Sequence, residues 1–308
     1  MVEREDIFEV RESDIVAPSA HEHRSTWRLL RRLCLPATLA DSLPGATVVE
    51  GLVVDTETTG LQQQRDEVIQ LALIPFRYDR DSGQVLSIGL DEAYVGLREP
   101  SVPVSPAAFA IHGIGADALR GQTIDDGRVQ ELAEAARLVV AHNADFDRPL
   151  VEKHWPVFAR SNWGCSLRGV NWAGYGAGSA SLSALATRYG FFFDSHDAME
   201  DARATLALLT RTLPDQRQVL AAVRESALRT DWLVRAVDAP HDANTRLRER
   251  GYRWRPRTEP GGGSWWTVTG EVEAEQDWLG EAVYGGRDHS VVTRITAANR
   301  HSARIWNG

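Results

Sequence analysis

From residue 51 to residue 212, short apolar segments of strand length alternate with segments of helical periodicity, and this alternation limits the folds open to the chain. Three strand-like segments come first, with a DRDSG turn between the last two: GLVVD, EVIQLALIPFRYD and QVLSIGLDEAYV. Consecutive strands of this kind predict an antiparallel meander. Because strands and helices then alternate, we predict an α/β domain whose mixed β-sheet is flanked by helices.

Apolar periodicity places the later elements along the chain. Strands are expected in LVVAH and near 163–167, and helices at 105–119, 126–136, 145–154, 181–189, 197–212 and 214–237. DAPHDA then forms a linker. Residues 242–308 contain an Arg-rich helical segment, YRWRPR, SWWTVT and an acidic helical segment, which predict a small Arg/Trp-rich α+β domain with the order α-β-β-α.

Two further segments precede the main domain. Residues 1–22 are polar, acidic and aperiodic, which predicts a disordered tail. HRSTWRLLRRLCL has apolar residues at helical spacing and predicts a short helix before the breakers Pro36 and Pro44. The expected parts are therefore a tail at 1–22, a helix and linker at 23–46, a main domain at 47–237 and a small domain at 242–308.

Composition restricts the protein's class. The content of 43% hydrophobic and 25% charged residues is ordinary for a globular protein. No segment approaches the roughly 18 apolar residues that span a bilayer, and the acidic start lacks the features of a signal peptide, so we expect a cytoplasmic protein without membrane contact. Cys34 and Cys165 form no CxxC pair, which argues against a zinc site or a disulfide framework.

The net charge of −9 argues against a protein that coats nucleic acid by electrostatics alone. It is compatible with an enzyme that holds phosphate through metal ions. In GLVVDTETTG, Asp55 and Glu57 stand two residues apart at the end of a predicted strand, so both carboxylates point to the same side. Such a pair suits Mg²⁺ or Mn²⁺, which prefer oxygen ligands. A bare DxE, however, is more often a solvated strand end.

Two later segments add acidic groups and a histidine. In HNADFDRPLVE, a helix follows a strand, and either Asp145 or Asp147 can supply a third carboxylate. In FFFDSHDAMEDARATLALL, Asp197 and Glu200 form a predicted capping box. This assignment makes His196 and Asp201 neighbours, at positions where a hydrophobic staple normally sits; the alternative is a capped surface helix with a solvated histidine.

Taken in order, these segments resemble the DEDDh exonucleases of the DnaQ-like superfamily, which includes the proofreading epsilon subunit of bacterial replicative polymerases. The similarity covers roughly residues 51–212 and rests on four elements. They are DTETTG, SPAAFAIHGIGADAL with its IHGI core, HNADFD, and HDAMED with its H-x4-D spacing. The resemblance implies an RNase H-like fold and a 3′→5′ exonuclease.

The resemblance also assigns site residues. It makes Asp55, Glu57, Asp147 and Asp201 the ligands of two divalent metal ions, Mg²⁺ or Mn²⁺, and thereby selects Asp147 over Asp145. It makes His196 the general base, which suits a side chain whose unperturbed pKa is about 6.5. Four more residues would lie near the substrate: Thr56, Thr58, His112 and Gly113.

The expected reaction is hydrolysis of single-stranded DNA from its 3′ end, releasing nucleoside 5′-monophosphates. An RNA exonuclease is the first alternative, because contacts to the 2′-OH are not visible in the motifs. A proofreading subunit bound to a polymerase and a binding module without activity are the others. The folded C-terminal domain favours a free-standing enzyme, and the presence of every catalytic residue argues against the binding module.

The C-terminal domain offers a second nucleic-acid feature. In GYRWRPR, alternation places Tyr252 and Trp254 on one face and the arginines, including Arg255, on the other. Aromatic platforms beside arginines are what single-strand binding uses, so these three residues are predicted substrate contacts. The alternative is that the aromatic side chains form a small core against Trp278 and Leu279.

Overall fold

The computed structural model describes residues 29–36 and 45–307. The chain in it divides into two compact units between Ser226 and Ala227. The predicted tail at 1–22 lies outside the described residues. Among the described residues, no helix has both the length and the apolarity needed to cross a membrane.

The expected N-terminal helix differs from the structure where the two can be compared. Its first residues, 23–28, lie outside the described part. Further on, strand β1 (Arg31–Arg32) pairs in parallel with β8 (Phe191–Phe192). The backbone N–H of Leu33 donates to the Phe192 carbonyl, so pairing with a distant segment overrides the local helical periodicity.

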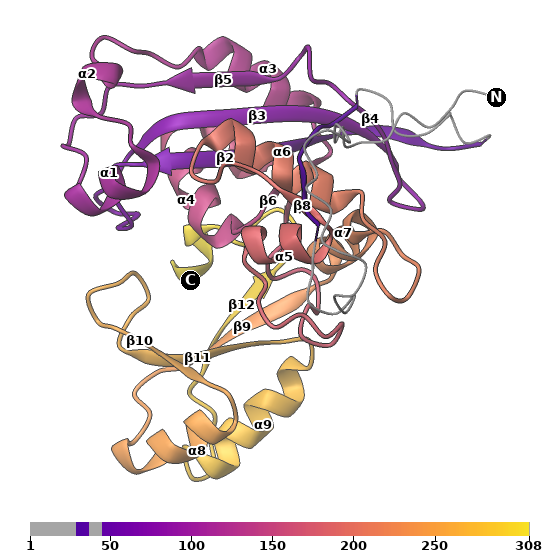
Figure 1. The fold of residues 1–308 in the computed structure, drawn as a ribbon. Coiled ribbons are helices and arrows are strands. Elements are labelled where there is room, and N and C mark those ends of the chain that lie inside the picture. The colour runs from indigo at the N-terminus through magenta and orange to yellow at the C-terminus, as the bar shows by residue number, and fades with distance from the viewer. Residues whose placement is uncertain (1–28, 37–44, 308) are drawn as a thin grey trace, which may run out of the picture. The chain divides into compact units, whose positions relative to one another are not determined.

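A six-stranded mixed sheet forms the centre of the first unit (Figure 1), in the order β4-β3-β2-β6-β7 with β5 also paired to β3. Its strands are β2 (Val48–Thr58), β3 (Val68–Asp79), β4 (Val85–Ile88), β5 (Tyr94–Leu97), β6 (Leu138–Ala141) and β7 (Trp163–Cys165). β3 is antiparallel to its three partners, whereas β6 runs parallel to β2 and β7. The predicted mixed sheet with an antiparallel start is confirmed. The third predicted strand is split into β4 and β5 by a turn closed from Glu92 N–H to the Gly89 carbonyl.

Helices cover this sheet on both faces. They are α1 (Pro106–His112), α2 (Ala116–Leu119), α3 (Asp126–Ala135), α4 (Ala144–His154), the 3-10 helix η2 (Pro156–Arg160), α5 (Leu182–Arg188), α6 (Ala198–Leu209) and α7 (Val219–Leu228). The single helix predicted at 105–119 is two, because Gly113 ends α1 in a left-handed conformation, with φ of 70°. The other helices of this unit lie close to their expected positions.

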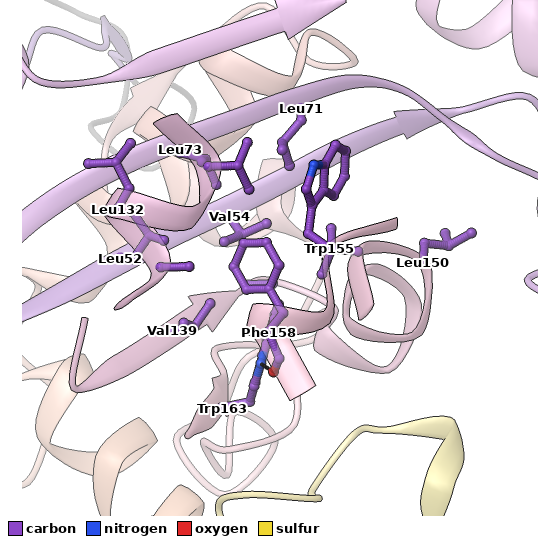
Figure 2. Close-up of a cluster of buried hydrophobic side chains, with 14 of the residues drawn as sticks. Leu52, Val54, Leu71, Leu73, Leu132, Val139, Leu150, Trp155, Phe158 and Trp163 are labelled. Carbon is purple, nitrogen blue, oxygen red and sulfur yellow. Dashed lines mark hydrogen bonds between the residues drawn. The ribbon is translucent and has the colours of Figure 1, made fainter. Parts of the chain in front are cut away.

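One face of the sheet packs against α3, α4 and η2 in a single apolar cluster. Figure 2 shows Phe158 of η2 directed toward the strand residues Val54 and Val139. The strand residues that alternate with this cluster, such as Val53 and Ala72, are also fully buried. Burial on both faces makes β2 and β3 a rigid support for the side chains at the ends of these strands.

The second unit is a four-stranded antiparallel sheet ordered β10-β11-β9-β12, with α8 and α9 on one face (Figure 1). Its elements are β9 (Asp231–Ala236), the 3-10 helix η3 (His241–Ala243), α8 (Asn244–Glu249), β10 (Arg253–Arg255), β11 (Ser264–Thr269), α9 (Val272–Ala282), β12 (Val291–Ile295) and the 3-10 helix η4 (Ala303–Trp306). The predicted α-β-β-α order holds for α8 to α9. The helix predicted at 214–237 is wrong in its second half, which is β9. This segment is an inner strand bonded on both sides, so the second unit begins earlier in the sequence than expected.

Candidate active site

The end of β2 presents the first two carboxylates. Pairing of β2 with β6 stops at Val53↔Val140, while pairing with β3 continues through Asp55↔Ala72 and Glu57↔Gln70. Asp55 and Glu57 therefore stand on one face of a strand that is held on one side and open on the other. Both side chains are half-buried.

Helix α6 brings Asp201 to this strand end. Asp197 caps the helix as predicted, because its Oδ1 accepts from the N–H groups of Met199 and Glu200 (both 3.1 Å). Ala198 and Ala202 are fully buried. Their small side chains let α6 pack closely on β2 and β3, so Asp201 reaches the carboxylates of the strand.

His196 is joined to Asp201 directly. Its backbone N–H donates to Asp201 Oδ2 over 2.7 Å, which confirms the predicted proximity, although through the backbone and not the ring. The ring is exposed. The residue has φ of 73°, a left-handed conformation that costs a non-glycine residue about 1–3 kcal/mol. Glu200, expected to close the capping box, instead accepts from Arg203 Nη1 over 2.9 Å.

The structure distinguishes Asp145 from Asp147, the two candidates for the third carboxylate. Asp147 in α4 is 4% exposed, and its Oδ1 accepts from the Thr56 hydroxyl over 2.8 Å. Asp145 is half-exposed and forms an ion pair with Arg168. Asp147 is therefore the residue of this motif that faces the end of β2.

One carboxylate oxygen each from Asp55, Glu57 and Asp201 lie within 4.8 Å of one another. Asp147 is outside this set, and its negative charge raises the pKa of Asp55. Three converging oxygen donors with a fourth carboxylate nearby fit a hard divalent cation, which takes oxygen ligands and keeps several waters. The residues present thus match the metal site that the sequence predicts.

Burial and mutual repulsion raise the pKa of every carboxylate in this group. Burial is the first cause for each, and the pKa of Asp55 rises well above its usual range. Burial raises the pKa of Glu57 to about 8, that of Asp147 to about 7 and that of Asp201 to about 6. The group therefore binds protons near neutral pH unless a cation compensates its charge.

His112 and the threonines support the strand end. Ile114 N–H donates to His112 Nδ1 over 3.0 Å, so the ring proton is on Nε2 and is donated to the Thr58 carbonyl over 3.2 Å. The Thr58 hydroxyl donates to the Gly60 carbonyl over 2.7 Å. His112 thus ties the end of α1 to the end of β2 with both nitrogens in use, and burial lowers its pKa.

The four predicted neighbours of the substrate are therefore placed as follows. Thr56 and Thr58 are buried and bonded within the protein, His112 is half-buried, and Gly113, the left-handed end of α1, is exposed. Their contacts with a nucleotide remain a prediction.

Gln70 is a site residue that the sequence analysis missed. It is buried on β3, directly opposite Glu57, and it reaches the first turn of α6. Its Nε2 donates to Asp197 Oδ2 and its Oε1 accepts from Ala198 N–H, each over 3.1 Å. Gln70 therefore fixes α6 to the strand that carries the carboxylates. A glutamine in an apolar strand pattern is the only sign in the sequence.

The predicted contacts in the C-terminal unit divide into two kinds. Tyr252 is 3% exposed, stacks on Trp278 and belongs to the core with Leu279. The alternative of an aromatic core therefore holds for Tyr252, and its ring is not free to stack on a base. Trp254 is 49% exposed. Arg255 is paired with Glu259 over 3.0 Å, and its guanidinium lies 3.7 Å from the centre of the Trp306 ring.

We expect Gln70→Leu to lower turnover by up to about 100-fold, because displacement of α6 would misplace Asp201 and His196. Loss of two buried hydrogen bonds would also cost about 1–3 kcal/mol of stability. The matched control is Gln218→Leu, since Gln218 likewise joins two elements by accepting from Val85 N–H over 3.1 Å. Turnover at saturating metal and urea unfolding should be measured for both. An equal loss of turnover in the two variants would contradict a positioning role.

We also expect the metal-free protein to lose stability as the pH rises from about 6 to about 8, through the pKa values of Asp201, Asp147 and Glu57. The same groups titrate near pH 4 when unfolded, so over this range the folded state binds more protons and ionisation favours unfolding. Urea unfolding in chelator across this range would test it. Glu57→Gln should weaken the dependence of the free energy of unfolding on pH. A free energy of unfolding that rises with pH would contradict the raised pKa values of these carboxylates.

The family model described as Exonuclease, named RNase_T, matches residues 52–209, just over half of the chain. A search of the curated proteins found no match.

Among solved structures, exonuclease X in complex with 5′ overhanging duplex DNA is 24% identical, with 56% of this chain and 99% of that chain covered and a TM-score of 0.40. E. coli exonuclease I with a 5cy-dA13 oligonucleotide is 20% identical, with 61% and 48% covered and a TM-score of 0.46. The exonuclease I of Methylocaldum szegediense is 23% identical, with 57% and 40% covered and a TM-score of 0.39. The chain thus spans less than half of these two exonuclease I chains.

The match of the family model agrees with the mixed sheet, the flanking helices and the acidic cluster described above. The predicted RNase H-like α/β fold is therefore confirmed for the first unit. The chain therefore belongs to the exonuclease family, the DnaQ-like family of the DEDDh type that its motifs resemble.

Proposed function

We propose that the chain is a metal-dependent exonuclease that removes nucleotides from the 3′ end of single-stranded DNA and releases nucleoside 5′-monophosphates. The observation that carries the proposal is the set of Asp55, Glu57 and Asp201 oxygens within 4.8 Å of one another, with Asp147 beside them. Gathering these four carboxylates serves no purpose for stability, because the charges of Asp147 and Asp201 raise the pKa of both Asp55 and Glu57.

In this proposal Asp55, Glu57, Asp147 and Asp201 hold two divalent ions, Mg²⁺ or Mn²⁺. Such ions, when bound, polarise the scissile phosphate, lower the pKa of water and stabilise the departing 3′ oxygen. Asp201 has a second task, since its Oδ2 accepts from the His196 backbone and so fixes the turn that carries the base.

His196 accepts the proton of the attacking water. Its ring is exposed and therefore accessible to solvent and substrate, and the left-handed turn holds it next to the carboxylates. Asp147 is held by the Thr56 hydroxyl, so this acid is already oriented without substrate. The residues thus form a preorganised site in which proton transfer and phosphate binding are separate tasks.

We expect His196→Ala to lower single-turnover rates by about 10²–10⁴-fold while metal affinity is retained, because only the general base is removed. Asp55→Ala should impair both. Calorimetric titration of Mn²⁺ and rapid-quench kinetics would separate the two effects. Equal activity of His196→Ala and the unaltered chain would refute the role of the histidine.

The two aspartates of α4 provide a matched pair of variants. Asp147→Asn should lower activity strongly, because it removes a charge that faces the site, whereas Asp145→Asn should leave activity near its original value. Both side chains keep their size, and only Asp147 is buried. A greater loss of activity in Asp145→Asn would show that Asp145, and not Asp147, is the metal-binding aspartate of this motif.

The substrate is tested with end-labelled single-stranded DNA, duplex DNA, mismatched duplex and RNA of matched sequence, with Mg²⁺, with Mn²⁺ and with chelator. We expect fastest shortening of single-stranded DNA from its 3′ end, in the presence of metal alone. Faster digestion of RNA than of single-stranded DNA would show that RNA is the preferred substrate and contradict the proposal. Preference for mismatched ends together with co-purification of a polymerase would indicate proofreading.

A further inference from the structure

The edge of the second unit's sheet carries arginines that the protein itself does not neutralise. Arg253 lies on β10, Arg257 follows this strand and Arg248 lies on α8, and all three are exposed. Within residues 45–307, no carboxylate forms an ion pair with any of them, in contrast to Arg255 beside Glu259. Exposed cations without acidic partners remain available for an external anion.

Tryptophans lie beside two of these arginines. The guanidinium of Arg248 lies 5.2 Å from the centre of the Trp265 ring, and that of Arg253 lies 5.6 Å from the Trp266 ring. Trp254 meets Trp265 edge-on, with ring centres 5.6 Å apart, and remains 49% exposed. The segment from α8 to β10 thus combines arginines with an aromatic ring that is half open to solvent.

Most acidic groups of this unit lie outside the segment from α8 to Arg257: residues 244–257 contain six arginines and one acidic residue, Glu249 of α8. Residues 227–308 contain 12 arginines and 11 acidic residues, so the unit is nearly neutral in total. Four exposed acids are on or next to α9: Glu271, Glu273, Asp277 and Glu281. The edge formed by β10 and α8 is therefore a local positive surface on a nearly neutral unit.

We propose that this surface, the arginine–tryptophan edge (Arg248, Arg253, Trp254 and Arg257), binds single-stranded DNA. Arginines at this edge complement phosphates, and the open face of Trp254 can stack on an unpaired base, a combination that single-strand binding requires. The inference rests on the proposed function for its choice of DNA. Tyr252, a contact predicted from the sequence, is not part of this surface because it lies in the core. Arg248 and Arg257, which precede and follow β10 in the sequence, are part of it.

Binding is measured with the full chain in chelator, which prevents hydrolysis, by the fluorescence anisotropy of a 5′-labelled oligo-dT. The triple variant Arg248→Ala/Arg253→Ala/Arg257→Ala should bind at least about tenfold more weakly. Its plot of log affinity against log salt should be shallower by about 2, because each lost phosphate contact removes about 0.7. An unchanged affinity and slope would overturn the inference.

Single variants provide the matched controls. Arg287→Ala removes an exposed arginine that follows α9, outside the edge, and should leave the affinity unchanged, whereas Arg253→Ala should weaken binding. Equal effects of these two substitutions would overturn the assignment to this surface. Trp254→Ala should weaken binding about tenfold and Trp254→Phe should retain it, because the ring supplies stacking. An equal effect of Trp254→Ala on a blunt duplex would overturn the single-strand assignment.

The two proposals can fail separately. If the unaltered chain hydrolyses DNA with metal while the triple variant binds as tightly as the unaltered chain, only the arginine–tryptophan edge is refuted. If the unaltered chain binds DNA through these residues but hydrolyses none of the test substrates, the proposed function fails and the edge stands as a DNA-binding surface.

Discussion

Repulsion among partly or fully buried carboxylates is the constraint on which the rest of the first unit depends. Burial raises the pKa of Asp55, Glu57, Asp147 and Asp201, and each negative charge disfavours the next. Left to themselves, these side chains would separate or be protonated. The fold holds them together by building the site on a strand covered on both faces and a helix packed closely on it. A bound divalent cation would compensate the negative charges and thereby relieve the repulsion between the carboxylates.

Several polar side chains near the site serve this purpose and have no evident catalytic task. Gln70 joins β3 to the start of α6, His112 joins α1 to the end of β2, and Thr56 orients Asp147. Each of these contacts connects an element that carries one or two of the acids to another element of the unit. Precision of about an ångström matters for catalysis, and such contacts supply it more reliably than packing alone. The left-handed His196 fits the same view, because its strain is held by the bond to Asp201.

The sequence predicted the first unit well because its signals are local. Asp55 and Glu57 follow an apolar strand with period two, and Asp197 caps a helix with regular spacing, so short-range chemistry determines both. Gln70 could not be identified in this way, because its partners are 127 and 128 residues away. β1 and β9 were expected as helical for the same reason, since pairing with distant strands decides their conformation. Choosing Asp147 over Asp145 needed the family motif, and the structure supplied the physical difference in burial.

The distribution of charge matters more for this protein than its net value. Residues 1–226 contain 22 basic and 32 acidic residues, so a DNA strand is repelled by this unit except where bound cations neutralise the carboxylates. Residues 227–308 contain nearly equal numbers, but residues 244–257 hold six arginines against one acid, whereas five acids are on or next to α9. A chain of net charge −9 can therefore bind a polyanion, provided that binding is confined to two small places. Attraction confined to such places restricts where a single strand binds more than a uniformly basic surface would.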